Sequence, residues 1–191
     1  MTLLLHMCCG PCTAYPLAVL RAEGYSLRGF FYNPNIHPFQ EFKRRLAAME
    51  TLAERERVDV LFCREYGLTE YLRRVVFHEE DRCAICYEMR LAATAAYARE
   101  IRADAFTTTL LYSRYQKHDL IRRKAEQVAE QYKVPFYYRD FRDGWQQGID
   151  MAMEMGLYRQ PYCGCIYSEQ ERYDKKAKGK GQKAKGKNIL G

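Results

Sequence analysis

Short apolar runs alternate with amphipathic patterns along the chain. Five runs have the length of β-strands: residues 3–7, 27–32, 58–62, 105–108 and 135–138. Apolar residues at alternating spacings of three and four, in 39–53 and again in 121–132, predict helices with one buried face. Residues 13–23 and the alanine-rich stretch 84–102 are also predicted to be helical.

Alternating strands and helices favour a parallel sheet covered on both faces. We therefore expect a doubly wound, Rossmann-type α/β domain with five parallel strands and helices on both faces. In such sheets ligands bind beyond the carboxyl ends of the strands, where the strand order reverses. That place lies between the first and fourth strands, which run into Cys8 and Thr107.

Charge is concentrated at one end of the chain. Residues 174–191 contain seven lysines and one acid, so they contribute +6 of the formal net charge of +7. We interpret this Lys/Gly/Ala-rich segment as a disordered basic tail that follows a near-neutral folded domain, residues 1–173. Such a tail adds salt-dependent affinity for phosphate backbones without sequence preference.

The hydropathy pattern argues against a membrane protein. No run approaches 18 apolar residues, and the apolar N-terminal run is too short for a secretory signal. We expect a cytoplasmic location. The cysteine content of eight, in a chain with 48% hydrophobic residues, then favours thiolate or metal chemistry over a disulfide scaffold.

Seven of the eight cysteines fall into three tight groups, of which the first is Cys8, Cys9 and Cys12. They lie in a predicted strand-to-helix turn, where Gly10 permits a tight backbone and Pro11 suits the start of a helix. Because a helix N-terminus stabilises negative charge, we expect thiols with lowered pKa values here.

The other two groups are pairs. Cys83 and Cys86 open the alanine-rich helix three positions apart, so both thiols can reach one metal centre. Cys163 and Cys165 flank Gly164, and two thiols so close can chelate one ion or form a strained, redox-active disulfide. The remaining cysteine, Cys63, stands alone and is interpreted as structural.

Several further residues are weaker candidates. His6 is expected to be a core histidine rather than a ligand. The segment 33–38 can line the pocket or simply form a turn, and the threonines of 107–109 lie at the predicted strand reversal. Residues that can stack on a base or hold phosphate, but that equally suit core or surface positions, are Tyr112, Ser113, Tyr115, Arg139, Arg142 and Arg159.

Taken in order, these motifs resemble the QueH type of epoxyqueuosine reductase. The resemblance extends from about residue 3 to residue 173 and rests on five segments: His6–Cys12, 31–36, 82–86, 106–110 and 157–165. It implies a HUP-like α/β fold and an oxidoreductase that removes the epoxide oxygen from epoxyqueuosine in tRNA, the last step of queuosine synthesis.

The resemblance also implies a [4Fe-4S] cluster, with Cys8, Cys9, Cys83 and Cys86 as its four thiolate ligands. It implies that Cys163 and Cys165 are a redox pair or ligands of a neighbouring iron. Some family members have aspartate near the position of Cys12, so this residue is assigned only as a possible third ligand of that iron. Our hypothesis is that electrons pass from the cluster to this iron. The electron donor is not identified.

Two other classes of function remain open. Cys9-Gly10-Pro11-Cys12 reproduces the thioredoxin C-G-P-C sequence, which suggests a thiol–disulfide oxidoreductase using Cys9 and Cys12. Alternatively, two C-x-x-C pairs separated by about 70 residues, of which Cys9 and Cys12 form the first, can make a Cys₄ zinc site in a non-catalytic RNA-binding module. ATP binding is not expected, because no glycine-rich phosphate loop follows the first strand.

The charge distribution generates a first prediction. Deleting residues 174–191 should weaken tRNA affinity at low salt, because the tail carries most of the net charge, yet leave the reduction chemistry intact. Binding titrations at two salt concentrations, with iron and sulfide analysis alongside, test this. Loss of the cluster on deletion would contradict the assignment of the tail as an accessory.

Overall fold

Four strands form one parallel sheet in the order β3-β2-β1-β4 in the computed structural model, which describes residues 1–174. The strands are β1 (Thr2–His6), β2 (Ser26–Phe31), β3 (Val60–Phe62) and β4 (Ala105–Thr108). In register, Leu4 of β1 lies opposite Arg28 of β2 and Phe106 of β4. The parallel sheet and four of its predicted strands are thus confirmed.

Helices connect the strands. The α-helices are α1 (Gly10–Ala22), α2 (Phe39–Arg55), α3 (Leu68–Val75), α4 (Arg82–Glu100), α5 (His118–Tyr132), α6 (Trp145–Glu154) and α7 (Ile166–Tyr173). Short 3-10 helices are η1 (Glu79–Asp81), η2 (Thr109–Tyr112) and η3 (Arg142–Gly144). Helix α1 begins before residue 13, where the apolar pattern starts, because Pro11 is well suited to the first turn.

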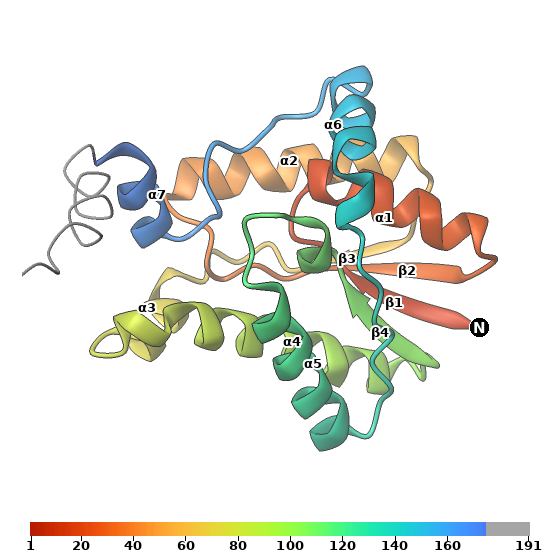
Figure 1. The fold of residues 1–191 in the computed structure, drawn as a ribbon, viewed down its shortest axis with the longest axis horizontal. Coiled ribbons are helices and arrows are strands. Elements are labelled where there is room, and N and C mark those ends of the chain that lie inside the picture. Colours follow the sequence, from red (N-terminus) through yellow and green to blue (C-terminus); the bar gives the residue numbers. More distant parts are fainter. Residues whose placement is uncertain (175–191) are drawn as a thin grey trace, which may run out of the picture.

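The helices cover both faces of the sheet, as predicted (Figure 1). Helices α1, α2 and α6 lie on one side, and α4 and α5 on the other. Burial on both faces explains why β1 is an almost unbroken apolar run, in which Leu3, Leu4 and Leu5 have no exposed surface. The core therefore consists of the central strands and the helices on either side.

The prediction of a fifth strand is wrong. Residues 135–138 make a single parallel bridge, Phe106 to Phe136, with hydrogen bonds from Phe106 N to Pro135 O and from Tyr137 N to Phe106 O. Pro135 has no N–H to donate, and β4 ends at Thr108 where the chain turns into η2. The pairing therefore cannot extend into a strand.

The strand order confirms where the sheet reverses. From β1 the chain continues to β2 and β3 on one side of β1, and it then returns to form β4 on the other side. The direction in which strands are added therefore reverses between β1 and β4. Cys8 follows β1 and Thr109 follows β4, and the backbone N–H of Cys8 donates to the Thr109 hydroxyl at 3.0 Å. The first cysteine group therefore lies at the expected ligand-binding edge.

Two further expectations concern the ends of the chain and the membrane. Apart from Asp174, the predicted basic tail, 174–191, lies outside the described residues. Within residues 1–174, no helix combines the length and apolar character needed to cross a bilayer.

The packing predicts how unequally two leucines of the sheet contribute to stability. Leu4→Ala should lower the free energy of unfolding by about 2–5 kcal/mol, because its side chain is 0% exposed in the central strand. Leu61→Ala should cost about 1 kcal/mol or less, because Leu61 is 43% exposed on edge strand β3. Urea unfolding of both variants checks this, and equal losses would contradict it.

Candidate metal centre

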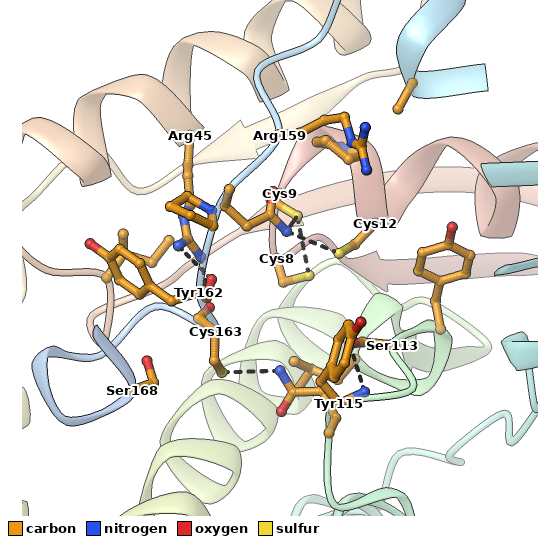
Figure 2. Close-up of a pocket in the computed structure, with 18 of the residues that line it drawn as sticks. Cys8, Cys9, Cys12, Arg45, Ser113, Tyr115, Arg159, Tyr162, Cys163 and Ser168 are labelled. Carbon is orange, nitrogen blue, oxygen red and sulfur yellow. Dashed lines mark hydrogen bonds between the residues drawn. The ribbon is translucent and has the colours of Figure 1, made fainter. Parts of the chain in front are cut away.

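Three cysteine thiols converge where β1 meets α1. Cys9 occupies the N-cap of α1 in extended conformation, and Cys12 lies in the first turn of the helix. The sulfur atoms of Cys8, Cys9 and Cys12 all lie within 4.8 Å of one another (Figure 2). Within residues 1–174, this is the one group of three or more Cys, His or acidic side chains so closely spaced. Three soft sulfur donors at this spacing suit a thiophilic metal.

Polar side chains from distant parts of the chain hydrogen-bond to these sulfur atoms. The Thr109 hydroxyl donates to Cys8 Sγ at 3.2 Å. The Gln160 amide donates to Cys9 Sγ at 2.9 Å and to Cys12 Sγ at 3.4 Å. Hydrogen bonds to cysteine sulfur stabilise thiolates and tune the metals they bind.

The three thiols differ in acidity. Hydrogen bonds from Cys12 and Cys9 hold the pKa of the Cys8 thiol well below its usual range. Burial raises the pKa of Cys9, and the hydrogen bond with Cys8 raises that of Cys12. The lowered pKa expected for the whole group is therefore found only at Cys8. A bound metal replaces the protons that the other two thiols carry.

A buried arginine lies beside the cysteines. Arg90 of α4 is 3% exposed, donates to Asn33 Oδ1 at 2.6 Å and approaches Cys86 Sγ at 3.7 Å. No carboxylate within residues 1–174 pairs with it. Burial opposes its charge, but nearby sulfur atoms outweigh burial and raise the pKa of Arg90. These sulfur atoms belong to Cys86, Cys8 and Cys163.

Since an unpaired buried cation is costly, Arg90 requires negative charge at the cysteines. Its Nε also has no hydrogen-bond partner among the described residues. A thiolate-bound metal centre supplies that negative charge. The residues present therefore fit an iron–sulfur or thiolate-bound iron group.

The Cys163-Gly164-Cys165 loop is fixed by a second buried arginine. Arg45 of α2 donates to the carbonyl oxygens of Cys163 at 2.7 Å and Tyr162 at 2.9 Å, and its Nε donates to Glu41. Gly164 has φ +155, and a Cβ there would lie 2.9 Å from Asn35 Nδ2. The loop thus requires glycine at its centre and holds Cys163 toward the cavity (Figure 2).

Neighbouring cysteines raise the pKa values of Cys83 and Cys86. Burial raises the pKa of Cys86 to about 12, while Cys163 and Cys165 add to the rise and Arg90 opposes it. Burial also raises the pKa of Cys83, to which Cys165 adds. The two cysteine pairs therefore lie near each other, although their sulfur atoms do not form a group as compact as that of Cys8, Cys9 and Cys12.

The first cysteine group and Cys163 open into one cavity of about 600 Å³. Its lining includes Arg45, Arg90, Arg159, Tyr112, Tyr115 and Trp145. This volume is in the range of small-molecule and cofactor sites. The cavity therefore has room for a substrate group as well as a metal centre.

The structure places the weaker candidates in different settings. His6 is fully buried and bonded to Thr108 and Tyr32, as expected for a core histidine. Asn35, Ile36, Tyr112, Ser113, Tyr115 and Arg159 line the cavity, whereas Cys63 does not. Arg139 and Arg142 instead form ion pairs with Glu23 and Asp140.

Sequence reasoning gave no role to Arg90, Arg45 or Gln160. Arg90 lies one helical turn after Cys86, a spacing that could have indicated it. Arg45 follows Glu41 by four positions, which reads equally well as an ordinary surface ion pair. Gln160 lies in segment 157–165 of the family resemblance, but nothing local indicated its contacts with Cys9 and Cys12, which join residues about 150 positions apart.

The fold and site together define a class: an α/β protein whose parallel sheet carries, at its reversal point, a group of three cysteines suited to holding a metal. The chain belongs to the epoxyqueuosine reductase QueH family, whose model matches residues 3–171. It is 40% identical over 173 residues to the Dehalococcoides mccartyi epoxyqueuosine reductase QueH, covering 91% of this chain and 95% of that protein.

A second relative supports this family assignment, and a solved structure supports the fold. The Thermotoga maritima epoxyqueuosine reductase QueH is 34% identical over 187 residues, covering 92% of this chain and 94% of that protein. Among solved structures, a predicted subunit of tRNA methyltransferase from Methanocaldococcus jannaschii matches with a TM-score of 0.55 and 12% identity. That match covers 81% of this chain and 75% of the other, and at this identity it supports the fold alone.

The geometry predicts that Cys12 contributes to metal binding. Loss of a residue that only hydrogen-bonds to a metal ligand typically weakens metal binding by about 10–100-fold. Cys12→Ser should weaken iron binding by more than this, because the Cys12 sulfur lies within 4.8 Å of those of Cys8 and Cys9 and can itself be a ligand. Cys63→Ser is the matched control, since Cys63 lies outside the cavity. Iron and sulfide analysis after anaerobic reconstitution checks this, and equal metal content in the two variants would contradict it.

Proposed function

We propose that this chain is an epoxyqueuosine reductase, an oxidoreductase that removes the epoxide oxygen from epoxyqueuosine in tRNA. The observation that carries the proposal is the compact group of Cys8, Cys9 and Cys12 beside the unpaired cation of Arg90, in a chain of the QueH family. The reaction converts the epoxide to an alkene and releases water, consuming two electrons and two protons.

The proposed cofactor is a [4Fe-4S] cluster held by Cys8, Cys9, Cys83 and Cys86, with a second iron held by Cys163, Cys165 and Cys12. Such a group supplies single electrons and a Lewis acid for the epoxide oxygen. The position of Arg90 among sulfur atoms of several of these cysteines supports one shared anionic centre. The proximity of Cys12 to Cys8 and Cys9 also permits Cys12 to join the cluster's ligand set.

The chain's own residues prepare this site in three ways. Thr109 and Gln160 donate hydrogen bonds to cysteine sulfur, which stabilises negative charge there. Arg45 holds the backbone of the Cys163 loop, so the position of its sulfur is fixed before substrate binds. The cavity provides a recess beside the cysteines that can receive the reacting group.

The proposed partner is tRNA bearing epoxyqueuosine, in the cytoplasm, with an electron donor of still undefined identity. The Cys-rich turn occupies the position where nucleotide-binding folds of this type carry a glycine-rich phosphate loop. ATP is therefore not part of the proposal.

The geometry does not favour a thiol–disulfide oxidoreductase. Cys9 is 1% exposed and Cys12 is 8% exposed, and both have raised pKa values. A nucleophilic thiol for disulfide exchange is accessible and has a lowered pKa.

Anaerobic incubation of the iron-loaded protein with epoxyqueuosine-containing tRNA and a low-potential reductant tests the activity. We expect the nucleoside to lose the mass of one oxygen atom. If the fully loaded protein leaves the nucleoside mass unchanged, the proposed function is wrong. A colourless protein that contains one zinc and no sulfide would instead favour a zinc-stabilised module.

A double substitution tests the role of the C-x-C loop. Cys163→Ser/Cys165→Ser should lower turnover by more than about 100-fold, which is the largest loss typical when a residue that only hydrogen-bonds to a metal ligand is removed. The [4Fe-4S] cluster should stay intact. Turnover is measured with the same assay, and the cluster by its absorbance and EPR signals. Full turnover with an intact cluster would exclude this role for the pair.

A further inference from the structure

An aromatic wall forms one side of the cavity. The rings of Tyr112 and Trp145 stack with centroids 5.1 Å apart and planes at 28°. Tyr115 meets Trp145 edge-on, with centroids 5.6 Å apart and planes at 79°. Tyr112 is 2% exposed, whereas Tyr115 is 86% exposed and packs against no other ring in the described part of the chain. The wall thus combines the buried ring of Tyr112, which is fixed by packing, with the exposed ring of Tyr115.

Glycine makes this wall possible. A Cβ at Gly148 of α6 would lie 2.3 Å from the Tyr112 hydroxyl, so α6 can approach η2 this closely only with glycine there. The Tyr112 hydroxyl donates to the carbonyl oxygen of Trp145 at 2.8 Å, which joins the two elements. Trp145 is therefore held in place before any ligand arrives.

The segment that carries Tyr115 also contacts a cysteine of the proposed reaction site. Tyr87 donates to Gln116 Oε1 at 2.7 Å, which orients the Gln116 amide so that it donates to Cys163 Sγ at 3.1 Å. Gln116 directly follows Tyr115, and both line the cavity. The segment that carries Tyr115 therefore reaches the thiol of Cys163 through Gln116.

Two arginines lie beside this wall. Within residues 1–174, neither Arg114 nor Arg159 forms an ion pair with a carboxylate. Arg159 lines the cavity, and the Arg114 guanidinium lies 6.0 Å from the centre of the Trp145 ring. Aromatic faces beside unpaired arginines match single-stranded nucleic acid, whose bases stack and whose phosphates are anionic.

We propose that the open face of Tyr115, supported edge-on by Trp145, is the surface on which the modified base of the substrate RNA stacks, with Arg114 and Arg159 at the adjacent phosphates. The stacked base directs its epoxide-bearing substituent toward the cysteines. This inference rests on the proposed function, because that function makes the substrate an RNA with a planar heterocyclic base.

Trp145 is the single tryptophan of the chain, so its fluorescence reports on this subsite directly. The iron-loaded protein is titrated with an RNA stem-loop carrying epoxyqueuosine and with the same stem-loop carrying an abasic site at that position. We expect a saturable change in fluorescence with the first RNA and a much smaller change with the second. Equal changes with both would overturn the subsite.

Substitution of Tyr115 provides a second test. Tyr115→Ala should raise both the Kd for the RNA and the KM by about 5- to 150-fold, the range for loss of one base stack. Tyr115→Phe keeps the ring and should bind more tightly than Tyr115→Ala. Phe77→Ala is the matched control, since Phe77 is 91% exposed but lies outside the cavity.

Iron and sulfide content should remain unchanged in all three variants. If Tyr115→Ala binds and turns over as the native protein does, the subsite is overturned. A native protein that shows the base-dependent fluorescence change but removes no oxygen contradicts the proposed function and still supports the stacking subsite. The two failures are therefore distinguishable.

Discussion

A buried guanidinium without a carboxylate partner within residues 1–174 is the constraint on which this centre depends. Arg90 lies inside the domain, where an isolated charge is costly, and it faces cysteine sulfur atoms from three different segments. Those sulfur atoms must therefore carry negative charge for the folded state to be favourable. Thiolates satisfy this requirement, either as the free Cys8 thiolate that its lowered pKa favours or as thiolates bound to a metal.

The parallel sheet brings the participating segments together. Cys8, Cys9 and Cys12 follow β1, and Thr109 follows β4, because the two strands are neighbours and end at the same edge. The C-x-C loop is distant in sequence but is attached to α2 through Arg45. The chemistry is thus assembled from a strand end, a helix start and a loop, each held by contacts outside the reacting groups.

The first cysteine group and the aromatic side chains line one cavity. Cysteines form one part of its surface, while Tyr112, Tyr115 and Trp145 form another. This division gives an RNA base an aromatic surface that does not displace the metal ligands. It also explains a large, exposed tyrosine at the opening, which contributes little to folding and is available for a ligand.

Sequence by itself determined the fold class, four strands, the main helices and the three cysteine groups, because hydrophobic period and residue spacing are local properties. It overstated the sheet, since Pro135 withholds a ladder hydrogen bond that strand length does not reveal.

Only the tertiary structure decided that the three sulfur atoms of the first group converge within 4.8 Å, that Gln160 hydrogen-bonds to two of them, and that Arg90 lies beside Cys86. These contacts arise where strand ends, helices and loops distant in sequence meet. Burial and charge depend on that packing, so no pattern along the chain encodes them.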